Sequence, residues 1–173
     1  GLPARYLRRL TERGNLDRVG RGLYRHPEGP LTEHHSLVLV AARYPDSPIA
    51  LLSALQFHEL TTQWPRKVWI ARQHGRSTPE ASPVDLEVTH MSGDSFTEGV
   101  EQHVVEGVPV RIYSPAKTVA DCFKFRNKVG LDVAIEALRS YLRDGSSPVE
   151  DLYHFAEICR VRTVMHPYIQ ASV

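Results

Sequence analysis

The sequence predicts an α+β fold, and three observations support this prediction. The chain opens with a short, arginine-rich amphipathic segment. Its middle contains short runs that alternate apolar and polar residues, as half-buried strands do. Its last third carries apolar residues at helical spacing, interrupted by glycine and proline. We therefore expect a small N-terminal piece followed by a mixed helix-and-sheet domain.

Length and composition restrict the class of protein. The 173 residues allow one compact domain, or a small domain attached to a larger one. A hydrophobic content of 42% and a charged content of 24% are ordinary for a soluble globular protein. No apolar run approaches the roughly 20 residues of a membrane helix, and no signal peptide is visible. Cys122 and Cys159 form no CxxC pair, so we expect buried free thiols in a cytoplasmic protein.

Positive charge is concentrated at the start of the chain. Residues 1–25 hold seven arginines and two acids, a net charge of +5, whereas the whole chain has a formal charge of only +1. A local excess of this size indicates an anionic partner, although the overall pI does not. The arginines are Arg5, Arg8, Arg9, Arg13, Arg18, Arg21 and Arg25, and the acids are Glu12 and Asp17.

The same segment has a clear secondary-structure pattern. Its spacing predicts a helix over residues 3–13, with Pro3 in the first turn and Gly14 at the end. Tyr6, Leu7 and Leu10 fall on one side of this helix. The opposite side carries charged residues, which are Arg5, Arg8, Arg9 and Glu12.

A tight basic hairpin is predicted after the helix. Residues 16–19 and 23–25 form its strands, and Gly20-Arg21-Gly22 forms its turn. A basic helix followed by such a hairpin is the second half of a winged helix-turn-helix, whose helix enters the major groove. Arg18 and Arg21 of the wing would then contact phosphate or the minor groove. The alternative is a solvated arginine-rich helix beside a surface hairpin.

The domain boundary follows from this interpretation. A winged helix needs one or two helices before its recognition helix, and this sequence begins at Gly1 without an initiator Met. We therefore expect a partial N-terminal winged helix-turn-helix in residues 1–28, with the upstream helices absent. Residues 29–173 are expected to form the mixed helix-and-sheet domain.

The later elements are predicted from periodicity, turns and caps. We expect helices at 32–44, 54–60, 115–126, 131–143 and 161–169. Ser53 and Ser114 are expected to cap the second and third of these. A further helix is expected to follow a capping box at 147–150 and to reach residue 159. We expect strands at 67–71, 86–90, 100–105 and 108–113, with a short buried strand or lead-in at 49–52. Residues 73–83 are predicted to form a loop, and Glu106-Gly107 a two-residue hairpin turn.

No catalytic constellation emerges from the residues. The nine histidines show no metal-ligand spacing, and the GxSxG, P-loop and GxGxxG motifs are absent. Asp85 and Glu87 suggest a nuclease, but Val88 and Thr89 follow where the Glu-x-Lys pattern of such sites needs a lysine. Asp121 is expected to be a cap or surface residue. We therefore expect no enzyme activity, catalytic residue, metal or cofactor.

A second basic cluster occurs in the last third of the chain. Lys117 and Lys124 are seven residues apart and so share a helix face. Such a patch would extend a DNA footprint or bind an acidic partner, and the alternative is a solvated helix face. Its members are Lys117, Lys124, Arg126, Asn127 and Lys128.

Five stretches together resemble the AbiEi family, the antitoxins and transcriptional regulators of bacterial type IV toxin–antitoxin systems. The resemblance extends over nearly the whole chain, and YSPAKTVADCFKFRNKVG and LLSALQFHELT are its most specific parts. The stretches are LDRVGRGLYR, TEHHSLVLVAARYP, LLSALQFHELTTQWP, KVWIA and GVPVRIYSPAKTVADCFKFRNKVGLDVAIEAL.

The resemblance implies a winged helix that binds and represses the promoter of its own operon. The C-terminal domain would supply the antitoxin activity and oppose a nucleotidyltransferase-like toxin without a stable complex, with no cofactor or metal. The alternatives are a protein-interaction module, or an orphan regulator without a toxin. The candidate DNA contacts are Arg5, Tyr6, Arg8, Arg9, Arg13, Arg18 and Arg21. The candidates for antitoxin activity, from charge alone, are Lys117, Lys124, Arg126 and Lys128.

Overall fold

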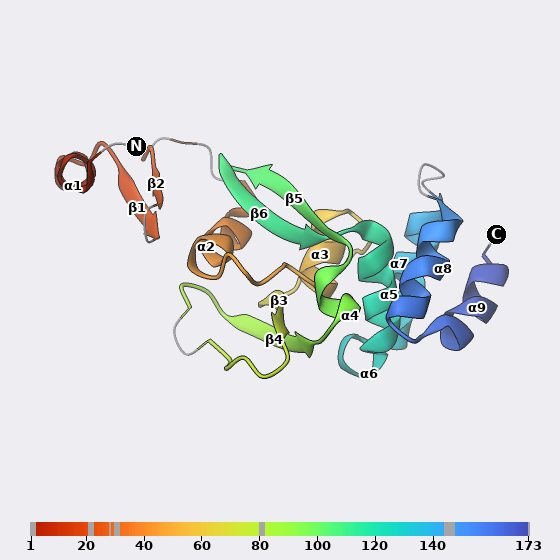
Figure 1. The fold of residues 1–173 in the computed structure, drawn as a ribbon. Coiled ribbons are helices and arrows are strands. Elements are labelled where there is room, and N and C mark those ends of the chain that lie inside the picture. The colour runs from red at the N-terminus through yellow and green to blue at the C-terminus, as the bar shows by residue number, and fades with distance from the viewer. Residues whose placement is uncertain are drawn as a thin grey trace.

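The computed structural model describes residues 3–20, 23–27, 29, 32–79, 82–143 and 148–172 of the chain. Figure 1 shows a helix and hairpin at the N-terminal end, a layer of strands in the middle and a group of helices at the C-terminal end. The predicted α+β fold class is confirmed by this arrangement. In the described residues, no helix is both long enough and apolar enough to cross a membrane.

The N-terminal part consists of helix α1 (Ala4–Glu12) and the antiparallel strands β1 (Asp17–Gly20) and β2 (Leu23–Arg25). Helix α1 begins directly after Pro3. The chain leaves it at Gly14, whose φ of 71° lies in the left-handed region that glycine tolerates best. The predicted helix, its glycine stop and the strand pair are therefore confirmed.

The central sheet is built from two strand pairs. Strand β3 (Val68–Gln73) runs parallel to β4 (Leu86–Met91), and β5 (Val100–Val105) runs antiparallel to β6 (Val108–Tyr113). Ile49 joins the two pairs by bridging to Ile70 on β3 and to Ile112 on β6. The expected strand at 49–52 is thus reduced to a single bridging residue.

Two helices accompany this sheet and bury its apolar side chains. Helix α2 (His35–Arg43) packs against β6 and β3, and helix α3 (Leu51–Phe57) packs against β3 and the C-terminal helices. The core beneath α2 contains Leu37, Val40, Ile49, Ile70 and Ile112, among others.

The C-terminal helices surround α5, in which every residue from Ala116 to Phe123 is buried. A larger core forms around it and includes Leu55, Tyr113, Phe123, Leu138 and Leu152. The helices of this part are α4 (Asp94–Thr97), α5 (Pro115–Lys124), α6 (Arg126–Val129), α7 (Leu131–Arg143), α8 (Val149–Ile158) and α9 (Arg162–Gln170).

The Ser53 cap is the clearest local correction. Helix α3 begins at Leu51, so Ser53 lies inside it, and its hydroxyl accepts a 2.9 Å hydrogen bond from the backbone N–H of Trp69. A tertiary partner thus replaces the local cap, because an isolated N–H beside the helix needs an acceptor.

The other differences between the predicted and observed element boundaries are smaller. Helix α2 starts at His35 rather than at Thr32, α5 ends at Lys124, and the short helix α4 was not predicted. The predicted cap at Ser114 and the hairpin turn at Glu106-Gly107 are confirmed. Ser147 of the predicted capping box lies outside the described residues.

Candidate nucleic-acid interface and the second basic cluster

Helix α1 presents arginines to solvent. Residues three and four positions apart share a helix face, so Arg5, Arg8 and Arg9 form one basic surface, and all three are exposed. The Arg8 guanidinium lies 2.9 Å from the Glu12 carboxylate, but these side chains are 82% and 61% exposed. Such a pair contributes little to stability and leaves Arg8 able to exchange its partner for another anion.

The opposite side of α1 is only weakly covered. Leu7 and Leu10 are half-buried, whereas Tyr6 is 48% exposed, and within the fully described helix no residue is buried. Arg13, directly after the helix, is also exposed. The arginines of the helix and Tyr6 are therefore accessible to a large ligand.

The β1–β2 hairpin carries a further exposed arginine. Arg18 is exposed on β1 and lies opposite Tyr24 of β2, with an irregularity in the register between Arg18 and Gly20. Strand β1 also lies next to helix α2, which connects the hairpin to the rest of the molecule. The predicted wing contact Arg21 lies outside the described residues.

Lys117 does not belong to a surface patch, and this corrects the expected second basic cluster. Its side chain is completely buried, and its ammonium lies 2.5 Å from the carboxylate of Asp121, which is also completely buried. Residues 117 and 121 are one helical turn apart and point to the same side of α5. Asp121 is thus neither a cap nor a surface residue, contrary to expectation.

The other basic members of that cluster, Lys124, Arg126 and Lys128, each have a partner within the molecule. Lys124 donates a 3.0 Å hydrogen bond to the Ser95 hydroxyl, and Arg126 donates one of 2.9 Å to the carbonyl of Phe123. Lys128 is 47% exposed and lies 3.9 Å from Glu87. These side chains therefore do not combine with Lys117 into one basic face.

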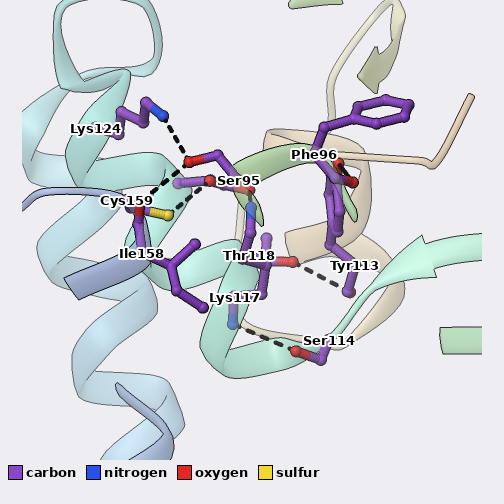
Figure 2. A network of polar contacts seen from close by, with 10 residues as sticks. Ser95, Phe96, Tyr113, Ser114, Lys117, Thr118, Lys124, Ile158 and Cys159 are labelled. Atoms are coloured by element: carbon purple, nitrogen blue, oxygen red, sulfur yellow. Dashed lines mark hydrogen bonds and ion pairs between the residues drawn. The ribbon is translucent and has the colours of Figure 1, made fainter. Parts of the chain in front are cut away.

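Around Lys117, Figure 2 shows side chains from α4, β6, α5 and the end of α8 that converge on a polar network. The Lys117 ammonium lies 4.2 Å from the centre of the Tyr113 ring, a cation–π contact. The Tyr113 hydroxyl donates to the carbonyl of Phe96 at 2.7 Å, and the Cys159 thiol donates to Asp121 at 3.2 Å. The network thus links four elements through one buried ion pair.

Burial controls ionisation in this network. Burial raises the pKa of the Asp121 carboxyl, although the Lys117 ammonium and the Cys159 thiol oppose the rise. It raises the pKa of Cys159 to about 12 and that of Cys122 well above its usual value, with the charge of Asp121 adding to both shifts. Both cysteines are free and buried, as predicted, so they behave as inert thiols.

The signal for the buried pair was present in the sequence. A lysine and an aspartate four residues apart, with apolar residues and a cysteine between and around them, lie on one helix face. Composition alone favours a surface position, because lysine is rarely fully buried unless it is paired.

The nuclease alternative gains no support from the geometry. Glu87 lies 3.4 Å from the ammonium of Lys67 and is also close to Lys128, so lysines already balance its charge. Asp85 is exposed. In the described part of the chain, neither residue belongs to a group of side chains close enough to share one metal ion.

The N-terminal part matches a known family. Residues 1–27 match the family model described as a transcriptional regulator, AbiEi antitoxin. The match covers helix α1 and the β1–β2 hairpin, and it confirms the resemblance to AbiEi antitoxins and regulators over residues 1–27. The stretches YSPAKTVADCFKFRNKVG and LLSALQFHELT lie outside the matched residues. No curated protein matches the chain.

The fold is also similar to that of a solved structure. The chain superposes on the RV2827C protein from Mycobacterium tuberculosis with a TM-score of 0.58 and 13% sequence identity. The superposition covers 91% of this chain and 60% of that protein, so the chain spans about three fifths of its neighbour's length. At this identity the likeness shows a shared fold alone.

Proposed function

We propose that this chain is a transcriptional regulator of the AbiEi antitoxin kind, which binds double-stranded operator DNA through α1 and the β1–β2 hairpin. The proposal rests on the overlap of two segments of the chain. The family match spans residues 1–27, and the segment with a net charge of +5 spans residues 1–25. Neutralisation of phosphates by arginine supplies much of the affinity of proteins for DNA.

In this proposal residues 1–28 are the DNA-binding segment, with α1 as the recognition helix of a winged helix and the hairpin as its wing. Arg5, Tyr6, Arg8 and Arg9 contact base edges and phosphates in the major groove. Arg13, Arg18 and Arg21 hold the backbone or the minor groove. The exposure of α1 on its arginine side supports this arrangement.

Residues 29–173 form the antitoxin domain in the same proposal. The regulator represses its own operon, and this domain opposes a nucleotidyltransferase-like toxin without forming a stable complex. It acts without catalysis or a cofactor. Co-expression with such a toxin tests this part: growth should recover with the full chain, and continued growth arrest would contradict it.

The DNA-binding part is tested by fluorescence anisotropy with the chain's own upstream duplex and a scrambled duplex, at about 50 mM and about 200 mM salt. We expect sequence-dependent binding that weakens with salt. Arg5→Ala or Arg9→Ala should cost about 1–3 kcal/mol on the specific duplex. Arg139→Ala, which removes an exposed arginine from α7, is the matched control and should bind as the parent does.

Equal binding of the parent and the α1 variants would contradict the proposal. That outcome would favour the second candidate, a protein-interaction module, which the exposure of Trp64 supports. Trp64 is 70% exposed, and two hydrogen bonds from Thr62 to the Glu136 carboxylate, of 2.8 and 2.9 Å, hold its loop on α7. Exposed tryptophans held in place are frequent anchors in protein interfaces.

A further inference from the structure

Three side chains with metal-binding atoms converge beside the β5–β6 hairpin. His58 follows the last residue of α3, and Glu101 and His103 lie on β5. One potential ligand atom from each lies within 4.8 Å of the other two, and no other such group occurs in the described residues. The His103 Nε2 atom is 2.8 Å from a Glu101 carboxylate oxygen.

The backbone explains why two of these side chains meet. Alternate residues of a strand point to the same face, so Glu101 and His103 project together from β5. On β6 they lie opposite Ile112 and Val110, both completely buried, and this pairing fixes the register of the two ligands. Two of the three ligands are thus held by a sheet rather than by a loop.

His58 is oriented by a hydrogen bond of its own. Its Nε2 atom lies 2.8 Å from the backbone carbonyl of Tyr113. Because a carbonyl only accepts hydrogen bonds, Nε2 carries the proton and Nδ1 keeps its lone pair. A histidine that ligates a metal usually donates its other N–H to a carbonyl or carboxylate in this way.

Ring packing further restricts the two imidazoles. The Phe57 ring contacts both edge-on, with centroid distances of 5.3 Å to His58 and 4.9 Å to His103. The His103 and Glu101 side chains remain 32% and 43% exposed, so an ion can reach them from solvent.

We propose that His58, Glu101 and His103 bind one divalent transition-metal ion, with Zn²⁺ as the best match. Two imidazoles and one carboxylate suit Zn²⁺ and its neighbours, whereas Mg²⁺ and Ca²⁺ prefer oxygen ligands alone. Three protein ligands leave a fourth position for water or another ligand. The ion joins the end of α3 to β5, within residues 29–173 and outside the proposed DNA-binding segment.

The proposed metal site differs from the sequence-based expectation that the protein binds no metal. The sequence shows Glu101 and His103 two residues apart, a spacing that is common without any ion. His58 lies far away in the chain, and only the fold brings it to the pair.

The test uses the untagged full chain, stripped with a chelator and titrated with Zn²⁺ by calorimetry. Co²⁺ serves as a second probe, because its visible absorption reports the ligand set and coordination number. We expect one ion per chain. Glu101→Gln and His103→Ala should each weaken binding by at least about tenfold. Mutation of residues that only hydrogen-bond to a metal ligand already weakens metal affinity by about this factor.

His154→Ala, which removes an exposed histidine from α8, is the matched control and should leave binding unchanged. Circular dichroism checks that each variant is folded. His103 and Glu101 are chosen for substitution because they are partly exposed, whereas substitution of His58 would also remove its hydrogen bond to the Tyr113 backbone. The absence of Zn²⁺ and Co²⁺ binding by the parent would overturn the proposal. Equal binding by the parent and both ligand variants would do the same, leaving Glu101 and His103 as a simple ion pair.

Discussion

The Lys117 ammonium and the Asp121 carboxylate are both completely buried on one side of α5. Removal of two charges from water is costly, and their mutual attraction offsets this cost only with good geometry and additional hydrogen bonds. Here the Cys159 thiol and the Tyr113 ring supply the additional contacts. The pair therefore links α5 to β6 and to the end of α8.

We expect Lys117→Met to lower the free energy of unfolding by about 3–5 kcal/mol, because it leaves the buried Asp121 carboxylate without its counter-charge. The double variant Lys117→Met/Asp121→Leu should recover much of this loss, since an apolar pair needs no counter-charge. Urea denaturation measures both effects. Lys128→Met, at a half-exposed lysine, should change stability by less than about 0.5 kcal/mol. A similar small loss in Lys117→Met would contradict the interpretation.

Glu106 connects the β5–β6 turn to the residues before α2. Its carboxylate accepts hydrogen bonds from the N–H and hydroxyl of Thr32, at 2.8 and 3.0 Å, and lies 2.7 Å from Nδ1 of His35. Burial opposes ionisation of this carboxyl, but the hydrogen bonds from Thr32 and His35 outweigh it and hold its pKa below the usual value.

Glu106→Gln should therefore lower the free energy of unfolding by about 1.5–3 kcal/mol at neutral pH. Because the pKa is lowered in the folded state, the contribution of Glu106 is complete above the ordinary glutamate pKa and disappears as the pH falls through the folded value. The parent and variant should thus differ by a constant amount above the ordinary glutamate pKa of about 4.3 and converge as the pH falls below it in urea titrations. Glu33→Gln, at a 60% exposed side chain, is the control. A difference that stays constant over the whole pH range would contradict this.

Among the elements, the passage from α4 into β5 leaves no room for a side chain. Gly99 has a φ of 72°, and a Cβ atom there would lie 2.8 Å from Cβ of Lys117 and 2.9 Å from the Phe155 ring. Absence of a side chain at Gly99 lets α5 and α8 approach the start of β5. Glycine is thus required here for space as well as for its backbone angle.

Gly99→Ala should lower the free energy of unfolding by about 1–3 kcal/mol more than Gly75→Ala. Gly75 is a matched control because its φ of 86° is equally unfavourable for alanine, but nothing lies within 4 Å of the added Cβ. The difference between the variants in thermal or urea unfolding then isolates the steric clash. Equal losses would show that only backbone strain matters at Gly99.

At the scale of the whole molecule, the described residues of the N-terminal segment lie outside both hydrophobic cores. One core is built by α2 with the sheet and the other by α5 and its neighbouring helices. The contact of the N-terminal segment with the rest is mainly that of β1 with α2. Figure 1 shows the corresponding separation of α1 from α5–α9. We therefore expect folding of residues 29–173 to depend little on residues 1–28.

A fragment of residues 29–173 should unfold cooperatively, with a Tm within about 4 °C of the full chain, equivalent to about 1 kcal/mol. It should also lose DNA binding, because α1 and the hairpin are gone, while it keeps metal binding at His58, Glu101 and His103. Calorimetry and anisotropy check these outcomes. A fragment that lacks a cooperative transition would show that the two parts fold as one unit.

Features that depend on neighbours a few residues away were predicted correctly from the amino-acid sequence. These include the α+β class, the end of α1 at Gly14, the Glu106-Gly107 turn and the start of α5 at Ser114-Pro115. Local backbone angles, caps and apolar periodicity are properties of short segments, so they can be predicted without the fold.

Only the tertiary structure decided which distant residues meet. It pairs β3 with β4 in parallel, joins the two strand pairs through Ile49, and places Lys117 in the interior. It also brings His58 to Glu101 and His103. Spacing along the chain places Lys117 and Asp121 on one helix face but does not show what that face packs against, because burial and long-range proximity depend on how separate elements pack against each other.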